Sequence, residues 1–139
     1  MTLPPAELLE RMAPTLRKEI GPAVDGEYPR TQAFMAAVIL EKVARQLTLT
    51  PGHQRADAAE TAALVTDLDG LLSAESAPLA VRTIVTDEVA GGGDDALCRL
   101  IEALYAHRDA LGAPTFDAAL RRVRATLRAR VDRQMEYAG

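Results

Sequence analysis

The chain has 139 residues, a formal net charge of −4 at pH 7, one cysteine and no tryptophan. That length fits one domain with a hydrophobic core, while the acidic balance argues against a general nucleic-acid binder. A single cysteine excludes an internal disulfide, and the sequence shows neither a signal-peptide pattern nor an apolar run of about 20 residues. We therefore expect a cytoplasmic protein that binds neither nucleic acid nor membranes.

The first predicted helix covers residues 4–20. Its apolar residues recur at spacings of three and four, the period of one helical face: Leu8, Leu9, Met12, Leu16 and Ile20. Pro14 removes one backbone hydrogen bond inside this pattern, so we expect a kink there or two short helices. Gly21-Pro22 is the expected end of the element.

Residues 28–47 predict a helix that begins near Pro29 and is apolar around its circumference. Ala36, Leu40 and Val43 share one face, while Phe34 and Val38 point the other way. A helix that is apolar on every side is normally covered on every side. We therefore expect residues 30–47 to be the central helix of a bundle, or to bury the flank of Phe34, Val38 and Glu41 in an interface with a partner.

Three charged residues lie near that second flank. Glu41 and Arg45 are four residues apart in the order that favours an ion pair within a helix. The structural interpretation is that they pair with each other. The functional interpretation is a polar notch in which Arg30 and Arg45 bind a partner or an anionic ligand.

The middle of the chain predicts a loop, a helix, a break and a second, less regular helix. Thr50-Pro51-Gly52 marks a loop over residues 48–53. The following helix, 54–73, has an expected inward stripe of Ala58, Ala62, Val65, Leu68 and Leu72. Ser76 or Ala77 precedes the first-turn Pro78 of the next element. Residues 79–89 are rich in β-branched side chains, but a lone strand would have nothing to pair with, so we predict a helix.

The last two predicted helices have clear apolar faces. Asp94 or Asp95 is the expected cap of the first, in which Cys98 is predicted to be a buried, inert thiol. Gly112 is the expected C-terminal cap. The second covers residues 114–137, with the stripe Phe116, Leu120, Val123, Leu127, Val131 and Met135. The predicted fold is all-α: a single domain, residues 1–139, forming a bundle of about five to six helices.

Charge is segregated along the chain. Residues 56–95 hold nine acids, Glu75 among them, and one base, whereas the last predicted helix holds six arginines. Arg121, Arg124 and Arg128 form one stripe, which we place beside the apolar face, with Arg122 and Arg133 on the far side. This stripe either meets the acids within the fold or forms a docking edge for an acidic partner or a phosphorylated small molecule.

No constellation of residues predicts catalysis, a cofactor or a metal site. His53 and His107 lack the spacings of helical metal sites, and Gly91–Gly93 lacks the Lys-Ser/Thr of a phosphate-binding loop. We therefore predict no catalytic residue, no cofactor and no metal ligand.

The segment 6–49, with LLERMAPTLRKEIGPAVDGEYPRTQAFMAAVILEKVARQL, and the ending RATLRARVDRQMEYA resemble a bacterial family of small helical proteins of unknown function. The genes of that family lie beside aminoglycoside-phosphotransferase-like kinases and acyl-CoA dehydrogenases. The resemblance covers about half of the chain, departs from the family at Pro14 and supplies no catalytic residues. It implies a non-catalytic accessory role next to a kinase-like phosphotransferase or an acyl-CoA enzyme.

Two functions remain open from the sequence. The first is an accessory or interaction protein that forms a homo-oligomer or binds a protein partner. The second is a binding protein or enzyme for a phosphate- or carboxylate-bearing small molecule such as an acyl-CoA, held by Arg30, Arg45 or the stripe of Arg121, Arg124 and Arg128.

Overall fold

The computed structural model describes residues 2–73 and 77–139, and within these residues it contains helices and no strand. The predicted all-α fold is therefore confirmed. Packing divides the chain into two compact units, residues 1–54 with 137–139 and residues 55–136, which we call the hairpin and the bundle. The predicted single domain, residues 1–139, stays a prediction, because two units that share a helix can still fold together.

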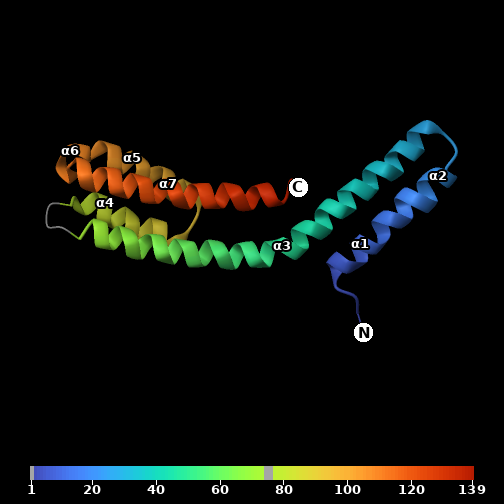
Figure 1. Cartoon of the computed structure of the whole chain (residues 1–139), viewed down its shortest axis with the longest axis horizontal. Helices are drawn as coiled ribbons and strands as arrows, with labels where there is room; N and C mark the ends of the chain where they lie inside the picture. Colours follow the sequence, from blue (N-terminus) through green and yellow to red (C-terminus); the bar gives the residue numbers. More distant parts are fainter. Residues whose placement is uncertain (1, 74–76) are drawn as a thin grey trace. The chain divides into compact units, whose positions relative to one another are not determined.

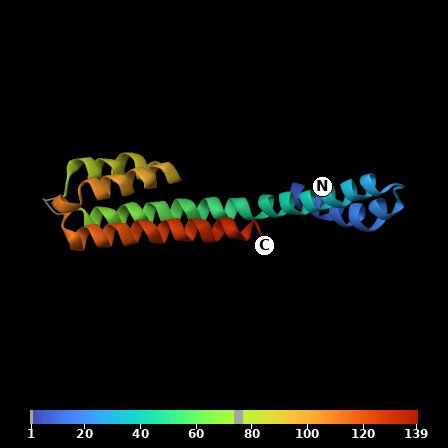
Figure 2. The same cartoon turned by 90° about the horizontal axis from the view of Figure 1, so that it is seen from above.

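The hairpin consists of two antiparallel helical runs. The first is made of α1 (Pro5–Thr15), a π-helical turn η1 (Leu16–Ile20) and the short α2 (Gly21–Ala23). After a turn in which Gly26 has φ = 100°, the chain reverses into α3 (Glu27–Leu71). Figures 1 and 2 both show α1 lying alongside the first part of α3.

The irregularity of the first run is a π turn that follows Pro14. Pro14 itself lies inside α1, and the π turn covers the next residues, 16–20. Such a turn inserts one residue into the helical repeat. In an unbroken α-helix Ile20, seven residues after Ala13, would lie on the same face as Ala13. With the inserted residue, Gly21 takes that place on the helix surface. Gly21 is accordingly buried against α3, and Ile20 is exposed.

α3 corrects two predictions from the sequence. The expected loop at residues 48–53 is helical, and α3 passes through Pro51 and Gly52. The residues on both sides of Pro51-Gly52 are packed helix, so tertiary contacts override the local loop signal. The segment 30–47 is also not a buried central helix. It is one of two helices in the hairpin, and most of its large apolar side chains are exposed, Met35, Ile39 and Leu47 among them.

The bundle packs the second part of α3 against four further helical segments. These are the continuous run of α4 (Leu79–Thr83), η2 (Ile84–Glu88) and η3 (Val89–Gly91), then α5 (Asp94–Ala106), α6 (Arg108–Leu111) and α7 (Ala113–Glu136). The helix predicted for residues 79–89 is thus confirmed, and the run ends where Gly92 and Gly93 take positive φ values. The predicted cap Ser76 and the acid Glu75 lie outside the described residues.

One contiguous core holds the bundle together. Its fully buried members include Leu64, Leu68, Leu97, Leu100 and Leu104, joined by Phe116, Leu120 and Val123 from α7. Leu68 and Leu72 confirm part of the stripe predicted for α3, but Ala58 and Ala62 are exposed and Leu64 lies inward in their place.

Three further side-chain predictions for the bundle are wrong. Cys98 is exposed on α5. Val131 and Met135 are also exposed, because the core face of α7 ends before its last turns. Asp94 and Asp95 lie in the first turn of α5, whose N-cap is Gly93. Carboxylates in a first turn still favour the positive end of the helix.

Candidate functional site

Small residues form the contact line between the two helices of the hairpin. Ala13 of α1 and Ala37 and Ala44 of α3 are buried there. At the turn end, Gly21 lies so close to α3 that a Cβ atom would stand 3.5 Å from the ring of Phe34 and 2.9 Å from its own helix, at the carbonyl oxygen of Leu16. The hairpin is therefore closely packed, but it buries almost no large apolar side chain.

The large apolar side chains of the hairpin gather on one side of this contact line. Around the axis of the first run, Met12 and Leu16 are displaced from the contact residue Ala13 in one rotational sense. Around the axis of α3, Leu40 and Leu47 are displaced from the contact residues Ala37 and Ala44 in that same sense. In antiparallel helices, positions offset in the same rotational sense emerge on the same side of the pair. We call this surface the hairpin face: Leu8, Leu9, Met12, Leu16 and Ile20 from the first run, and Ala36, Ile39, Leu40, Val43 and Leu47 from α3.

The hairpin face is apolar and open in the single chain. Met12 is 45%, Leu47 47% and Ile39 57% exposed. None of the ten side chains that define the face is charged. Charge lies instead on the opposite side of the hairpin, where Arg17 and Glu41 form an ion pair with N and O atoms 2.9 Å apart.

The residues that the sequence assigned to an interface, Phe34, Val38 and Glu41, lie on that opposite side. Phe34 is partly exposed over Gly21, and Val38 is half-buried. Glu41 is occupied by Arg17, so the predicted Glu41–Arg45 pair is wrong. Binding of a partner by these three residues stays a prediction. The broader exposed apolar surface is the hairpin face, which the sequence assigned to the core.

The structure does not bring Arg30 and Arg45 together. They are 15 residues apart on one helix, which places them about 22 Å apart along its axis. Each guanidinium donates to a backbone carbonyl, Arg30 to Val24 and Arg45 to Gly139. Next to Arg45, the hydroxyls of Tyr137 and Thr50 lie 3.0 Å apart, and the Tyr137 ring contacts His53 edge to face. Arg30 and Arg45 are too far apart to bind one small ligand jointly.

Within the bundle, arginines of α7 pair with acids of α3 and α5. Arg122 lies 2.6 Å from Asp67 of α3, and Arg130 lies 2.7 Å from Asp94 of α5. Arg133 binds Glu60 at 2.5 Å and also binds Asp57. The hydrogen bond to Glu60 raises the pKa of Arg133, against the opposing effect of burial. Arg133 is therefore held as a cation in a side chain that is 14% exposed.

The arginines that pair are not those that the sequence singled out. Arg122, Arg130 and Arg133 follow the border of the core face, so the placement of Arg122 and Arg133 on the far side is wrong. Arg121, Arg124 and Arg128 are exposed and bind no residue that the structure describes. They therefore meet none of the acids that the structure describes, while Glu75 lies outside the described residues. Their role in binding a ligand or partner stays a prediction.

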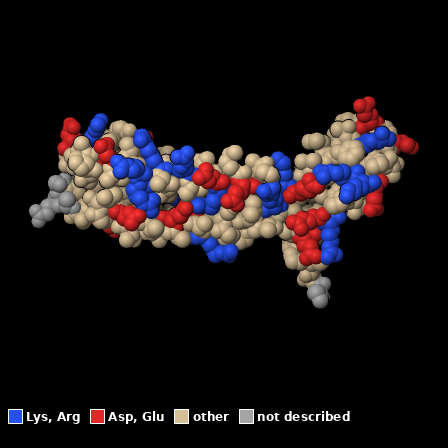
Figure 3. Space-filling view, in the orientation of Figure 1, with Lys and Arg blue, Asp and Glu red and all other residues tan. Residues whose placement is uncertain are grey.

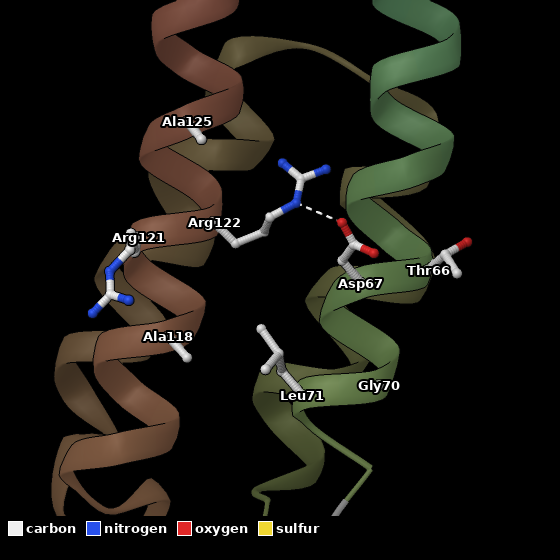
Figure 4. A pocket seen from close by; sticks show the side chains of 8 residues that line it. All are labelled: Thr66, Asp67, Gly70, Leu71, Ala118, Arg121, Arg122 and Ala125. Atoms are coloured by element: carbon white, nitrogen blue, oxygen red, sulfur yellow. Dashed lines mark hydrogen bonds and ion pairs between the residues drawn. The ribbon is translucent and has the colours of Figure 1, made fainter.

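An open groove of about 660 Å³ lies on the bundle between α3 and α7. Figure 4 shows Arg122 reaching across it to Asp67, while Arg121 points away from it. The rest of the lining is small or apolar: Thr66, Gly70, Leu71, Ala118 and Ala125. Because Asp67 neutralises the arginine that enters the groove, the lining offers little attraction to an anion.

Charges of both signs cover the surface. Figure 3 shows Lys and Arg side chains interleaved with Asp and Glu on the face in view, so no large basic field is visible there. Among residues 2–73 and 77–139, no three His, Cys, Asp or Glu side chains come together as a possible metal site. None of the helices formed by the described residues has the length and hydropathy needed to cross a membrane.

The sequence signal that could have revealed the hairpin face was the spacing of small residues. Ala37 and Ala44, seven residues apart, mark the contact line with α1, and the bulky residues flank it.

The chain matches no protein-family model, no curated protein and no solved structure.

Proposed function

We propose that this chain is a non-catalytic accessory protein that acts in the cytoplasm by protein–protein contact. The observation that carries the proposal is the hairpin face, an exposed apolar surface that continues across two neighbouring helices. Soluble monomers rarely leave a contiguous surface of this kind open, and such surfaces mark interaction sites.

The energetics of the face support a contact of useful strength. Six of its side chains are roughly half exposed: Leu8, Met12, Ile20, Ile39, Val43 and Leu47. Full burial of one such side chain is worth about 1.5–3 kcal/mol, so covering the exposed halves yields on the order of 5–9 kcal/mol. Association costs about 4–15 kcal/mol, so a stable complex needs a partner that contributes an apolar surface of its own.

The resemblance of segment 6–49 and of the chain's last helix to a family encoded beside kinases and acyl-CoA dehydrogenases suggests the setting. We place the protein next to a kinase-like phosphotransferase or an acyl-CoA enzyme, as an accessory that binds protein and carries out no chemistry itself.

The test is a comparison of the unmodified chain with Ile39→Glu/Val43→Glu, which places two carboxylates in the hairpin face. Each is used to capture proteins from an extract of the native cell, and each is weighed by light scattering. We expect the unmodified chain to form an oligomer or to retain a specific protein, and the variant to lose that association. A clean monomer that retains no protein contradicts the proposal.

A second candidate function has one observation in its favour. Arg121, Arg124 and Arg128 are exposed on α7 without a partner among the described residues, and guanidinium groups bind phosphate and carboxylate well. The candidate ligand is a phosphate- or carboxylate-bearing molecule such as an acyl-CoA. At 100 times its dissociation constant such a ligand adds about 2.7 kcal/mol of stability. A thermal-shift series with phosphate and coenzyme A thioesters, repeated on Arg121→Ala/Arg124→Ala/Arg128→Ala, tests it. No shift in the unmodified chain removes it.

A further inference from the structure

The two helices of the hairpin do not cover their own large apolar side chains. Its contact line buries Ala13, Ala37, Ala44 and Gly21, whereas its large apolar side chains lie beside that line and remain open. The run from Pro5 to Ala23 is interrupted by the π turn at residues 16–20, and a helix of this kind gains most of its stability from packing its apolar face. A partner that is only sometimes present would leave α1 held to α3 by this line of small residues alone for part of the time.

A second copy of the same chain meets this requirement, because it is present wherever the first copy is. The two surfaces also match in charge. No residue of the hairpin face is charged, so two copies can bring their faces together without opposing like charges. A two-fold axis lying in the plane of contact makes the same patch serve both copies, as in most homodimers.

The size of the surface fits a dimer as well. The helical run from Pro5 to Ala23 rises about 28 Å, and two helices side by side are about 20 Å wide. A flat area of those dimensions is roughly 560 Å², somewhat below the roughly 800 Å² that each partner buries in a standard protein interface. The hairpin face therefore has the size of a small protein interface.

We propose that two copies of this chain pack hairpin face to hairpin face, so that α1 and the first part of α3 of each copy form an intermolecular four-helix bundle. The inference rests on the proposed function, because it names the partner of the same surface. It also leaves the bundle, with the exposed Arg121, Arg124 and Arg128, open for contact with a different protein.

The experiment is sedimentation velocity on the full chain from 1 to about 100 μM with a reducing agent, since the exposed Cys98 could otherwise join two copies through a disulfide. The unmodified chain is expected at twice its 14.9 kDa mass. Ile39→Glu/Val43→Glu is expected to weaken the dimer at least 100-fold and run as a monomer. Ile39→Gln/Val43→Gln, which adds no charge, gives a smaller shift in the same direction. Leu79→Glu, at a 75% exposed apolar residue of the bundle, is the matched control and stays dimeric.

Amide hydrogen exchange on the same samples separates loss of the dimer from general unfolding. In the variants, amides of α1 are expected to lose protection while those of α5 keep it. A chain that is monomeric throughout the range overturns the inference. If that monomer retains a different protein through the hairpin face, the proposed function survives, and if it retains none, both fail. A dimer that persists in Ile39→Glu/Val43→Glu with α1 still protected also overturns the inference, because another surface then holds it.

Discussion

The hairpin and the bundle are built from the same kinds of residue but use them in opposite ways. The bundle buries leucines such as Leu68 and Leu100 in a contiguous core and leaves many alanines outside. The hairpin buries Ala13, Ala37 and Ala44 and leaves Met12, Ile39 and similar side chains open. The bundle therefore owes its stability to contacts within one chain, whereas the hairpin brings two helices close together and presents its apolar surface outward. Four substitutions test this contrast.

The largest effect is expected from the core of the bundle. Leu100→Ala removes a fully buried side chain of α5 and leaves a cavity, so it should lower the free energy of unfolding by about 3–5 kcal/mol. Leu79→Ala, at an exposed leucine of the neighbouring α4, should change it by about 0.5 kcal/mol or less. Urea unfolding followed by circular dichroism measures both. Equal losses would mean that the bundle core is not where the structure places it.

The next effect concerns the arginines of α7. Arg133→Met removes the cation that binds Glu60 and Asp57, so the loss in unfolding free energy should be about 1–3 kcal/mol. Arg124→Met, on the same helix but exposed and unpaired among the described residues, should be neutral within about 0.5 kcal/mol. The same urea titration compares them. A larger loss of unfolding free energy from Arg124→Met than from Arg133→Met would mean that Arg124 is the structural arginine and Arg133 the surface one.

A third substitution acts on the hairpin alone. Gly21→Val places a Cβ atom 2.9 Å from the Leu16 carbonyl oxygen and 3.5 Å from the Phe34 ring, which should cost about 1–3 kcal/mol in the stability of the hairpin. Hydrogen exchange should show faster exchange in α1 and the first part of α3, with the bundle amides unchanged. Gly52→Ala is the control, because its Cβ would meet nothing within 4 Å. Uniformly faster exchange would show that the two units unfold together.

The smallest effect is a gain. Gly70 lies near the end of α3, has no positive φ, and its Cβ would meet nothing within 4 Å. Gly70→Ala reduces the freedom of the unfolded chain without strain, so it should stabilise the bundle by about 0.5 kcal/mol. Thermal unfolding resolves a change of this size as an increase in Tm of a few degrees. A decrease in Tm would show that the groove beside Gly70 is less open than it is in the structure.

The sequence predicted the helices well and their partners poorly, for physical reasons. The period of Phe116, Leu120 and Val123 predicts the buried side of α7, because a polar border limits that stripe. Residues 30–47 have no polar border, so the period could not show which side faces α1. The side that faces α1 is the one with the small residues Ala37 and Ala44, since a contact line between closely spaced helices favours alanine over leucine.

Two further elements depended on information that no local pattern contains. Thr50-Pro51-Gly52 has the composition of a loop, but helices on both sides of it are packed and hold it in α3. The pairing of Arg122, Arg130 and Arg133 depends on how α7 is rotated about its axis against α3 and α5. A sequence-based prediction that assigns the wrong rotation places the paired arginines on the exposed side and the exposed arginines beside the acids.

The order of the two units along the chain affects how the protein is made. The hairpin precedes nearly all of the bundle, so a ribosome releases residues 5–47 while the segments of the core are still being synthesised. Nascent chains that show uncovered apolar surface are prone to aggregate. In the proposed dimer a second copy covers the hairpin face, so this step of assembly depends on concentration. Cells that make little of this protein, or make it far from its partner, should therefore depend on chaperones or lose it to proteolysis.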